Sequence, residues 1–227
     1  MCYSLESSAK TSALSLFAIV LLLQSNIPHL KWIGVMMVGW CGMQVAEFLL
    51  WLTNPRSSCT SMNKLVTLTI IPLVLLAQPL CGLFGSFFVK PWSSCSDNRK
   101  LFILIYSIIV LLPMMIYFYK GATKYCTTVT PDGHLDWWLS SFAPKYTNGH
   151  MIRYYVWLIM IIFPIFLLWD ISYKAVFAIC ILPLFGFFYG LKTDSSASIW
   201  CHYTSFTAIV SILIYVLYKS NIYNILK

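Results

Sequence analysis

A carboxylate inside an apolar stretch is the first feature of this sequence that could do chemistry. Residues 30–53 contain Glu47, with Trp40, Gln44 and Trp51 at spacings of four, three and four. This spacing places all four side chains on one helix face. A carboxylate at membrane depth can bind a proton or a cation, which makes it a candidate functional group. The alternative is a structural role, in which Glu47 hydrogen-bonds Gln44 or a neighbouring helix.

A histidine in the last apolar stretch is the second candidate. That stretch covers residues 198–218, where His202 shares a helix face with Ser198 and Ser205. An imidazole changes its protonation near neutral pH, so His202 could relay protons as the partner of Glu47. The alternative is an interfacial histidine whose ring is satisfied by lipid headgroups.

A glutamine next to a proline lies in the middle of the stretch 65–89. Pro79 has no backbone N–H, so it leaves the carbonyl of Leu75 without its helical donor. Gln78 could line a path through the protein. Nearby small residues such as Gly82 favour the simpler interpretation, which is close packing of two helices.

The composition defines the environment of these side chains. Hydrophobic residues make up 59% of the 227-residue chain and charged residues 10%, against about 25% charged residues in soluble domains. The mean hydropathy is +0.78. These values exclude a soluble enzyme, a disordered chain and a fibrous repeat, and predict an integral, multi-pass membrane protein whose partner is the lipid bilayer. We attribute the net charge of +8 to helix ends facing headgroups, not to nucleic-acid binding.

Seven apolar stretches are long enough, or nearly so, to cross a bilayer core of about 30 Å. They cover residues 12–27, 30–53, 65–89, 101–119, 154–169, 173–191 and 198–218. Their hydrophobicity is continuous, which favours helices over a β-barrel. We therefore predict one all-α domain over residues 1–227, a polytopic transmembrane bundle of about seven helices. Because the apolar core of the first stretch has 11 residues, a cleaved signal segment followed by six helices is the alternative.

The alternation of seven spans places Glu47 and His202 on one side of the membrane. Each lies within about two helical turns of the end of its span on that side, so we expect similar depths. Asp194 lies at the same entrance, and so does the long loop 120–153. A loop of this length is usually a lid or a binding element, or else an interfacial strap. A shared vestibule requires the second and seventh helices to be neighbours.

The same loop contains one further periodic pattern. Leu135, Trp138, Leu139 and Phe142 recur at helical spacing. This pattern predicts a short helix lying on the membrane interface.

Two loop cysteines bear on the orientation of the chain. The lysine and arginine residues divide seven against eight between the two sides, which does not orient the protein. Cys59 and Cys126 lie in loops on the same side, so a disulfide between them would form if that side is oxidising. That pairing would make the N-terminus extracellular or lumenal and the C-terminus cytosolic. The alternative is two unrelated thiols.

Several seven-helix families require residues that this sequence lacks. A retinal protein needs a lysine midway along its last helix, and residues 198–218 contain none. Zinc hydrolases of ceramide-like amides need about three suitably placed histidines, whereas here His202 alone is suitably placed. Haem bundles need paired axial histidines, which are also missing. We therefore expect no metal and no cofactor.

Three short motifs carry a resemblance to one group of proteins. They are Gln44-x-x-Glu47-x-x-x-Trp51, Gln78-Pro79 and Ser198-x-Trp200-Cys201. In this order they resemble uncharacterised seven-helix membrane proteins of large DNA viruses and algae. The resemblance implies a seven-helix fold and a viral source, and it implies nothing about chemistry.

The leading functional interpretation is a transport protein, a channel or a transporter, that moves protons, ions or a small solute. Glu47 would be the titrating or cation-binding group and His202 its relay partner. Gln44 and Gln78 would line the path. A lipid-modifying membrane enzyme using Glu47, His202 and Asp194 ranks lower, because no nucleophile–base pair is identifiable. The remaining alternatives are a receptor or assembly protein without chemistry, and a homo-oligomer whose pathway lies between subunits.

Overall fold

Among the residues that the structure describes, three helical segments are long and apolar enough to cross a membrane: Leu5–Leu23, Pro28–Leu52 and Ser61–Phe88. Their length and composition support an integral membrane protein with transmembrane helices. The structure, a computed structural model, describes residues 4–121, 126–131, 133–136 and 196–220, and the single residues 159, 161, 181 and 185. These single residues are helical. The seven-span count stays a prediction, because most of the fifth and sixth predicted spans lies outside the described residues.

The described chain is mostly helical. Its elements are α1 (Leu5–Leu23), α2 (Pro28–Leu52), α3 (Ser61–Leu65), the π-helical turn η1 (Val66–Ile70), α4 (Ile71–Gly85), the 3-10 turns η2 (Ser86–Phe88) and η3 (Trp92–Ser94), α5 (Asp97–Gly121), β1 (Thr128–Val129), β2 (Leu135–Asp136) and α9 (Ser196–Lys219). The segments α3, η1, α4 and η2 follow one another without interruption and form the third membrane-length helix, Ser61–Phe88.

Helix α1 begins two turns earlier than its apolar stretch predicted. Ser4 caps the helix, because its side chain accepts a hydrogen bond from the amide of Ser7. Glu6 and Lys10, four residues apart, form an ion pair on the exposed surface of the first turns. Cap and ion pair both stabilise a helical start that is polar, so the predicted boundary at residue 12 was wrong.

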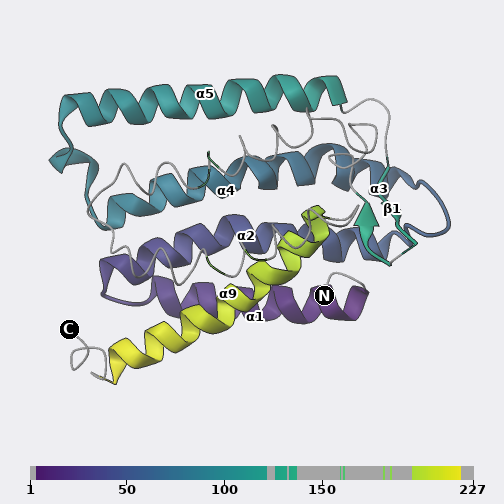
Figure 1. Cartoon of the computed structure of the whole chain (residues 1–227), viewed down its shortest axis with the longest axis horizontal. Coiled ribbons are helices and arrows are strands. Elements are labelled where there is room, and N and C mark those ends of the chain that lie inside the picture. Colours follow the sequence, from purple (N-terminus) through teal and green to yellow (C-terminus); the bar gives the residue numbers. More distant parts are fainter. Residues whose placement is uncertain are drawn as a thin grey trace.

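Helix α2 is the centre of the described bundle. It packs against α1, against α4 and against α9, which crosses α1 and α2 obliquely (Figure 1). Its large side chains are buried almost all round, as expected of a helix enclosed by others. The largest of its fully buried side chains are Leu30, Trp32, Ile33, Met36, Met37, Met43 and Leu50.

Small residues allow α2 and α4 to approach closely. A Cβ atom added to Gly39 would lie 2.8 Å from the Cα of Gln78 and 3.1 Å from the carbonyl oxygen of Ala77. The indole N–H of Trp32 donates to the carbonyl of Gly82 over 3.1 Å, near the end of α4. A Cβ atom added to Gly85 of α4 would lie 3.0 Å from Cβ of Val35, whereas one at Gly82 would lie 3.9 Å from the nearest atom. The close packing predicted for the small residues after Gln78 therefore holds at Gly85 and not at Gly82.

One end of the bundle carries the N-terminus, α3, the β1–β2 hairpin and the start of α9 (Figure 1). We call it the hairpin end. The chain leaves α2 and α5 at this end and leaves α1, α4 and α9 at the other. This is the alternation that the sequence predicted for these five helices.

The β1–β2 hairpin replaces part of the predicted interfacial helix. Leu135 lies in strand β2, where it pairs with Val129 of β1. Gly133, with a φ of 82°, closes the turn by donating its amide to the carbonyl of Thr130 over 2.9 Å. Turn chemistry therefore reverses the chain before the helical pattern begins, so the helix prediction is wrong for Leu135. The other residues of that pattern lie outside the described residues.

The α2–α4 contact yields a stability test. We expect Gly39→Ala to destabilise the protein by about 1–3 kcal/mol, because the new methyl group meets backbone atoms that cannot rotate away. Gly82→Ala is the control, since its Cβ would lie 3.9 Å from the nearest atom, Cγ of Met36. Thermal unfolding in detergent measures both variants, and equal stability of the two would contradict the close approach.

Candidate functional site

Polar side chains gather where α1, α2 and α9 meet, and we call this group the polar seam. Its members are Ser8, Thr11, Ser12 and Ser15 of α1, Gln44 and Glu47 of α2, and Thr204, Thr207 and Ser211 of α9. All of them except Thr11 are buried, and Thr11 is partly buried. The sequence predicted the two α2 residues, whereas most of the others are new.

Gln44 joins the three helices through its side-chain amide. Its Oε1 accepts a hydrogen bond from the hydroxyl of Thr11 over 3.0 Å. Its Nε2 donates to the hydroxyl oxygen of Thr204 over 3.2 Å. Gln44 is 1% exposed, so both bonds lie where water cannot replace them. They hold α1 and α9 at defined levels along α2.

Glu47 lies one helical turn from Gln44, toward the hairpin end, and it is fully buried. The antiparallel contacts of α1 and α2 pair Thr11 with Gln44 and Ser12 with Cys41. Continued by one turn, this register brings Ser8 of α1 to the level of Glu47. Ser8 is also fully buried. A carboxylate and a hydroxyl therefore mark the hairpin-end portion of the polar seam.

The α9 side of the seam continues toward the other end of the molecule. Thr204, Thr207 and Ser211 follow at spacings of three and four residues, so they share one face of α9. Thr207 and Ser211 are fully buried. Among the residues that the structure describes, neither of these two hydroxyl oxygens has a hydrogen-bond partner, and the same holds for Ser8.

His202 lies on a different face of α9 from the seam. It precedes Thr204 by two residues, which corresponds to a rotation of about 200° around the helix. Its ring contacts Tyr203 and Phe206 of the same helix, with centroid separations of 5.3 and 5.1 Å. Thr204 is therefore the α9 residue that the structure places against Gln44, and the pairing of His202 with Glu47 stays a prediction.

The other predicted site residues have separate surroundings. Gln78 is 1% exposed and lies on α4 opposite Gly39. Ser205 donates its hydroxyl to the carbonyl of His202 over 2.6 Å, so it serves its own helix. Ser198 belongs to α9, but the surroundings of its side chain lie outside the description, as does Asp194.

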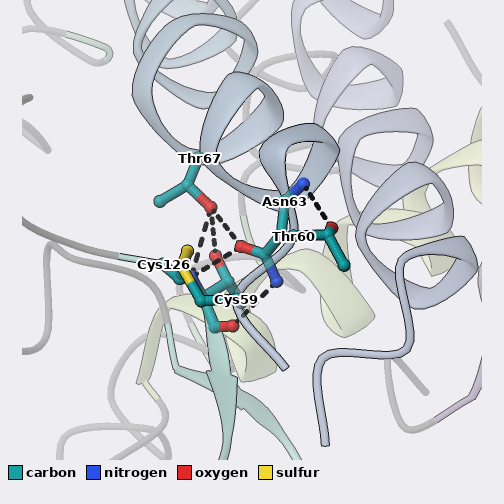
Figure 2. The surroundings of a disulfide bond; sticks show 6 residues. Cys59, Thr60, Asn63, Thr67 and Cys126 are labelled. Atoms are coloured by element: carbon teal, nitrogen blue, oxygen red, sulfur yellow. Dashed lines mark hydrogen bonds between the residues drawn. A yellow bond between two sulfur atoms is a disulfide. The ribbon is translucent and has the colours of Figure 1, made fainter. Parts of the chain in front are cut away.

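A second polar cluster lies at the hairpin end, beside a disulfide. Cys59 and Cys126 are bonded, with Cα atoms 5.7 Å apart (Figure 2). The sequence offered this disulfide as one of two interpretations, because both cysteines lie in loops on the same side of the predicted bundle. It connects the turn after α2 with the segment after α5, across a sequence separation of 67 residues.

Hydrogen bonds extend the connection around the disulfide (Figure 2). The side-chain amide of Asn63 donates to the carbonyl of Thr127 and accepts from its amide, each over 3.0 Å. The hydroxyls of Thr67 and Thr127 lie 2.8 Å apart. All three residues are at most 1% exposed. The cluster satisfies the buried backbone of residue 127 and anchors the β1–β2 hairpin to the third membrane-length helix.

No family model, curated protein or solved structure matches this chain. The resemblance to seven-helix proteins of large DNA viruses and algae stays a prediction. The function must therefore be argued from the polar seam itself. Among the described residues, no group of three or more His, Cys, Asp and Glu side chains could hold a metal ion.

Sequence reasoning missed the hydroxyl residues of the seam for a specific reason. Ser8 and Thr11 lie outside the first predicted span, which begins at residue 12. The hydroxyl spacing over residues 8–15 follows a helical period, and it would have identified a polar face if α1 had been extended. No comparable signal in the sequence assigns Thr204 to Gln44, because their contact joins residues 160 positions apart.

The contact between α2 and α9 yields a test by double-mutant cycle. We expect Gln44→Leu and Thr204→Val to couple by about 0.6 kcal/mol and at most about 1.7 kcal/mol, the range for hydrogen bonds between membrane helices. Unfolding of the four proteins in mixed detergent micelles measures the coupling. Gln44→Leu with Ser205→Ala is the control cycle, and it should be additive within about 0.5 kcal/mol. A coupling of zero in the first cycle would contradict the contact.

Proposed function

We propose that this protein is a membrane transport protein that moves protons, ions or a small solute, with Glu47 as its titrating or cation-binding group. The observation that carries the proposal is the complete burial of Glu47 between membrane-length helices. Burying a carboxylate costs several kcal/mol of lost hydration. A carboxylate at this depth has the capacity to bind and release a positive charge, which a neutral side chain lacks.

The neighbours of Glu47 support transport over lipid chemistry. Gln44, one turn away, holds α1 and α9 against α2 with hydrogen bonds to Thr11 and Thr204. These amide and hydroxyl groups can orient and solvate a charge, which a transport pathway needs. The seam therefore offers Glu47 a polar environment along a helix interface, as a pathway through a membrane requires.

A liposome assay tests the role of Glu47. We expect Glu47→Gln to reduce flux to the background level of empty vesicles, because the amide cannot exchange a proton or neutralise a cation. Proton, sodium and potassium fluxes are each measured on the purified full-length chain. Glu6→Gln is the matched control, since Glu6 lies on the exposed surface of α1 and pairs with Lys10. Unchanged flux in Glu47→Gln for every species that the native protein moves would refute the role.

We further propose that the hairpin end faces the oxidising side of the membrane, so that the N-terminus is extracellular or lumenal. The Cys59–Cys126 disulfide supports this orientation, because disulfides persist in extracellular and lumenal compartments and are rare in the cytosol. The buried contacts of Asn63 with Thr127 hold the two loops together beside it. These contacts favour a stable structural bridge at that face.

Thiol labelling in sealed vesicles, with the cytosolic face outward, tests the orientation. We introduce Ser93→Cys as a reporter at the opposite end, because Ser93 is exposed in the connection before α5. A membrane-impermeant maleimide should label this reporter directly. It should label Cys59 and Cys126 only after the vesicles are opened and reduced. Labelling of both native cysteines from the cytosolic face without reductant would overturn the proposal.

A further inference from the structure

We propose that the transported species is the proton, and that it moves through the polar seam along the hydroxyl groups of Ser8, Thr207 and Ser211. This inference rests on the proposed transport function and names its substrate and its route. Three observations carry it: buried hydroxyls with no described partner, their spacing along the helices, and a hydroxyl with several acceptors beside Gln44.

The first observation is the state of the three hydroxyls. Ser8, Thr207 and Ser211 are each fully buried, and their oxygens have no hydrogen-bond partner among the described residues. An unsatisfied buried hydroxyl costs about 1–3 kcal/mol, and native proteins satisfy such groups with ordered water. These positions are therefore suited to hold the water molecules of a proton path, because a hydroxyl both donates and accepts hydrogen bonds.

The second observation is the extent of the seam. Glu47 and Ser8 lie one turn from Gln44 toward the hairpin end, while Thr207 and Ser211 follow Thr204 in the other direction. At 1.5 Å per residue the groups extend over about 15 Å, which is half of a hydrocarbon core of about 30 Å. A bound metal cation requires several oxygen ligands that converge on one point. Polar groups that are spread over more than two helical turns are better suited to passing a proton from one group to the next.

The third observation is the hydroxyl of Thr11. It lies 3.0 Å from Oε1 of Gln44 and 3.1 Å from the carbonyl oxygens of Ser7 and Ser8. A hydroxyl has one proton, so these are alternative acceptors between which it can rotate. On the other side, the side-chain N–H of Gln44 donates to the hydroxyl oxygen of Thr204 over 3.2 Å. Gln44 therefore connects a hydroxyl of α1 with a hydroxyl of α9.

The experiment compares two sets of substitutions on α9 in the reconstituted full-length chain. Thr207→Val with Ser211→Ala removes the two relay hydroxyls while retaining the shape of the side chains. Ser205→Ala is the control, since that hydroxyl bonds a carbonyl of its own helix. The double variant breaks no hydrogen bond to a described residue, and thermal unfolding verifies that it is folded. The probe is the decay of an imposed pH gradient, with the membrane potential held by potassium and valinomycin.

We expect native protein and Ser205→Ala to dissipate the gradient at similar rates. The double variant should be slower by about tenfold, equivalent to a barrier higher by ~1.4 kcal/mol. An unchanged proton flux in the folded double variant would overturn the relay. Sodium or potassium flux that depends on Glu47, without proton flux, would overturn the proton as substrate and leave the transport function standing. Absence of all three fluxes in the native protein would overturn the proton relay and the role of Glu47 in cation transport.

Discussion

The hydrogen bonds of Gln44 are the interaction on which the described bundle depends. Lipid tails are as apolar as leucine, so burial of apolar surface does not favour one particular register between membrane helices. Gln44 supplies that register, because its amide has a donor side and an acceptor side and each finds a hydroxyl on a different helix. Once Thr11 and Thr204 are fixed at this level, the depths of Glu47 and of the remaining seam hydroxyls follow from helix geometry.

The sequence predicted those parts of the structure that depend on local composition. Long apolar runs can satisfy their backbone in lipid only as helices, so α1, α2 and the segment Ser61–Phe88 follow directly from hydrophobicity. The spacing of Gln44 and Glu47 also predicted that they are neighbours on one helix face, and both are buried in the structure. The errors occurred where polar chemistry competes with that pattern, as at Ser4, which caps α1, and at Gly133, which closes the hairpin.

Contacts between distant parts of the chain could not be predicted from hydrophobicity. Asn63 is an ordinary polar residue in the sequence, yet in the structure it satisfies both backbone groups of Thr127. Thr204 has no feature that distinguishes it from its neighbours until α9 is placed against α2. His202 is the opposite case. A histidine is unusual in a span and therefore attracts a functional prediction, but the α9 residue that contacts Gln44 is Thr204. Residue type reveals which groups are expensive to bury, and only the packing reveals what surrounds them.

The two packing surfaces of α2 differ in polarity and in how closely the neighbouring helices approach. Toward α4, Gly39 brings two backbones close together, and a surface of this kind has no room for water or for a solute. Toward α1 and α9 the same helix presents Gln44, and hydroxyl groups occupy the facing positions. Glu47 follows Gln44 by one turn of the same helix and is fully buried. Under the proposed transport function, movement of α1 or α9 along the polar seam would be the step coupled to protonation of Glu47.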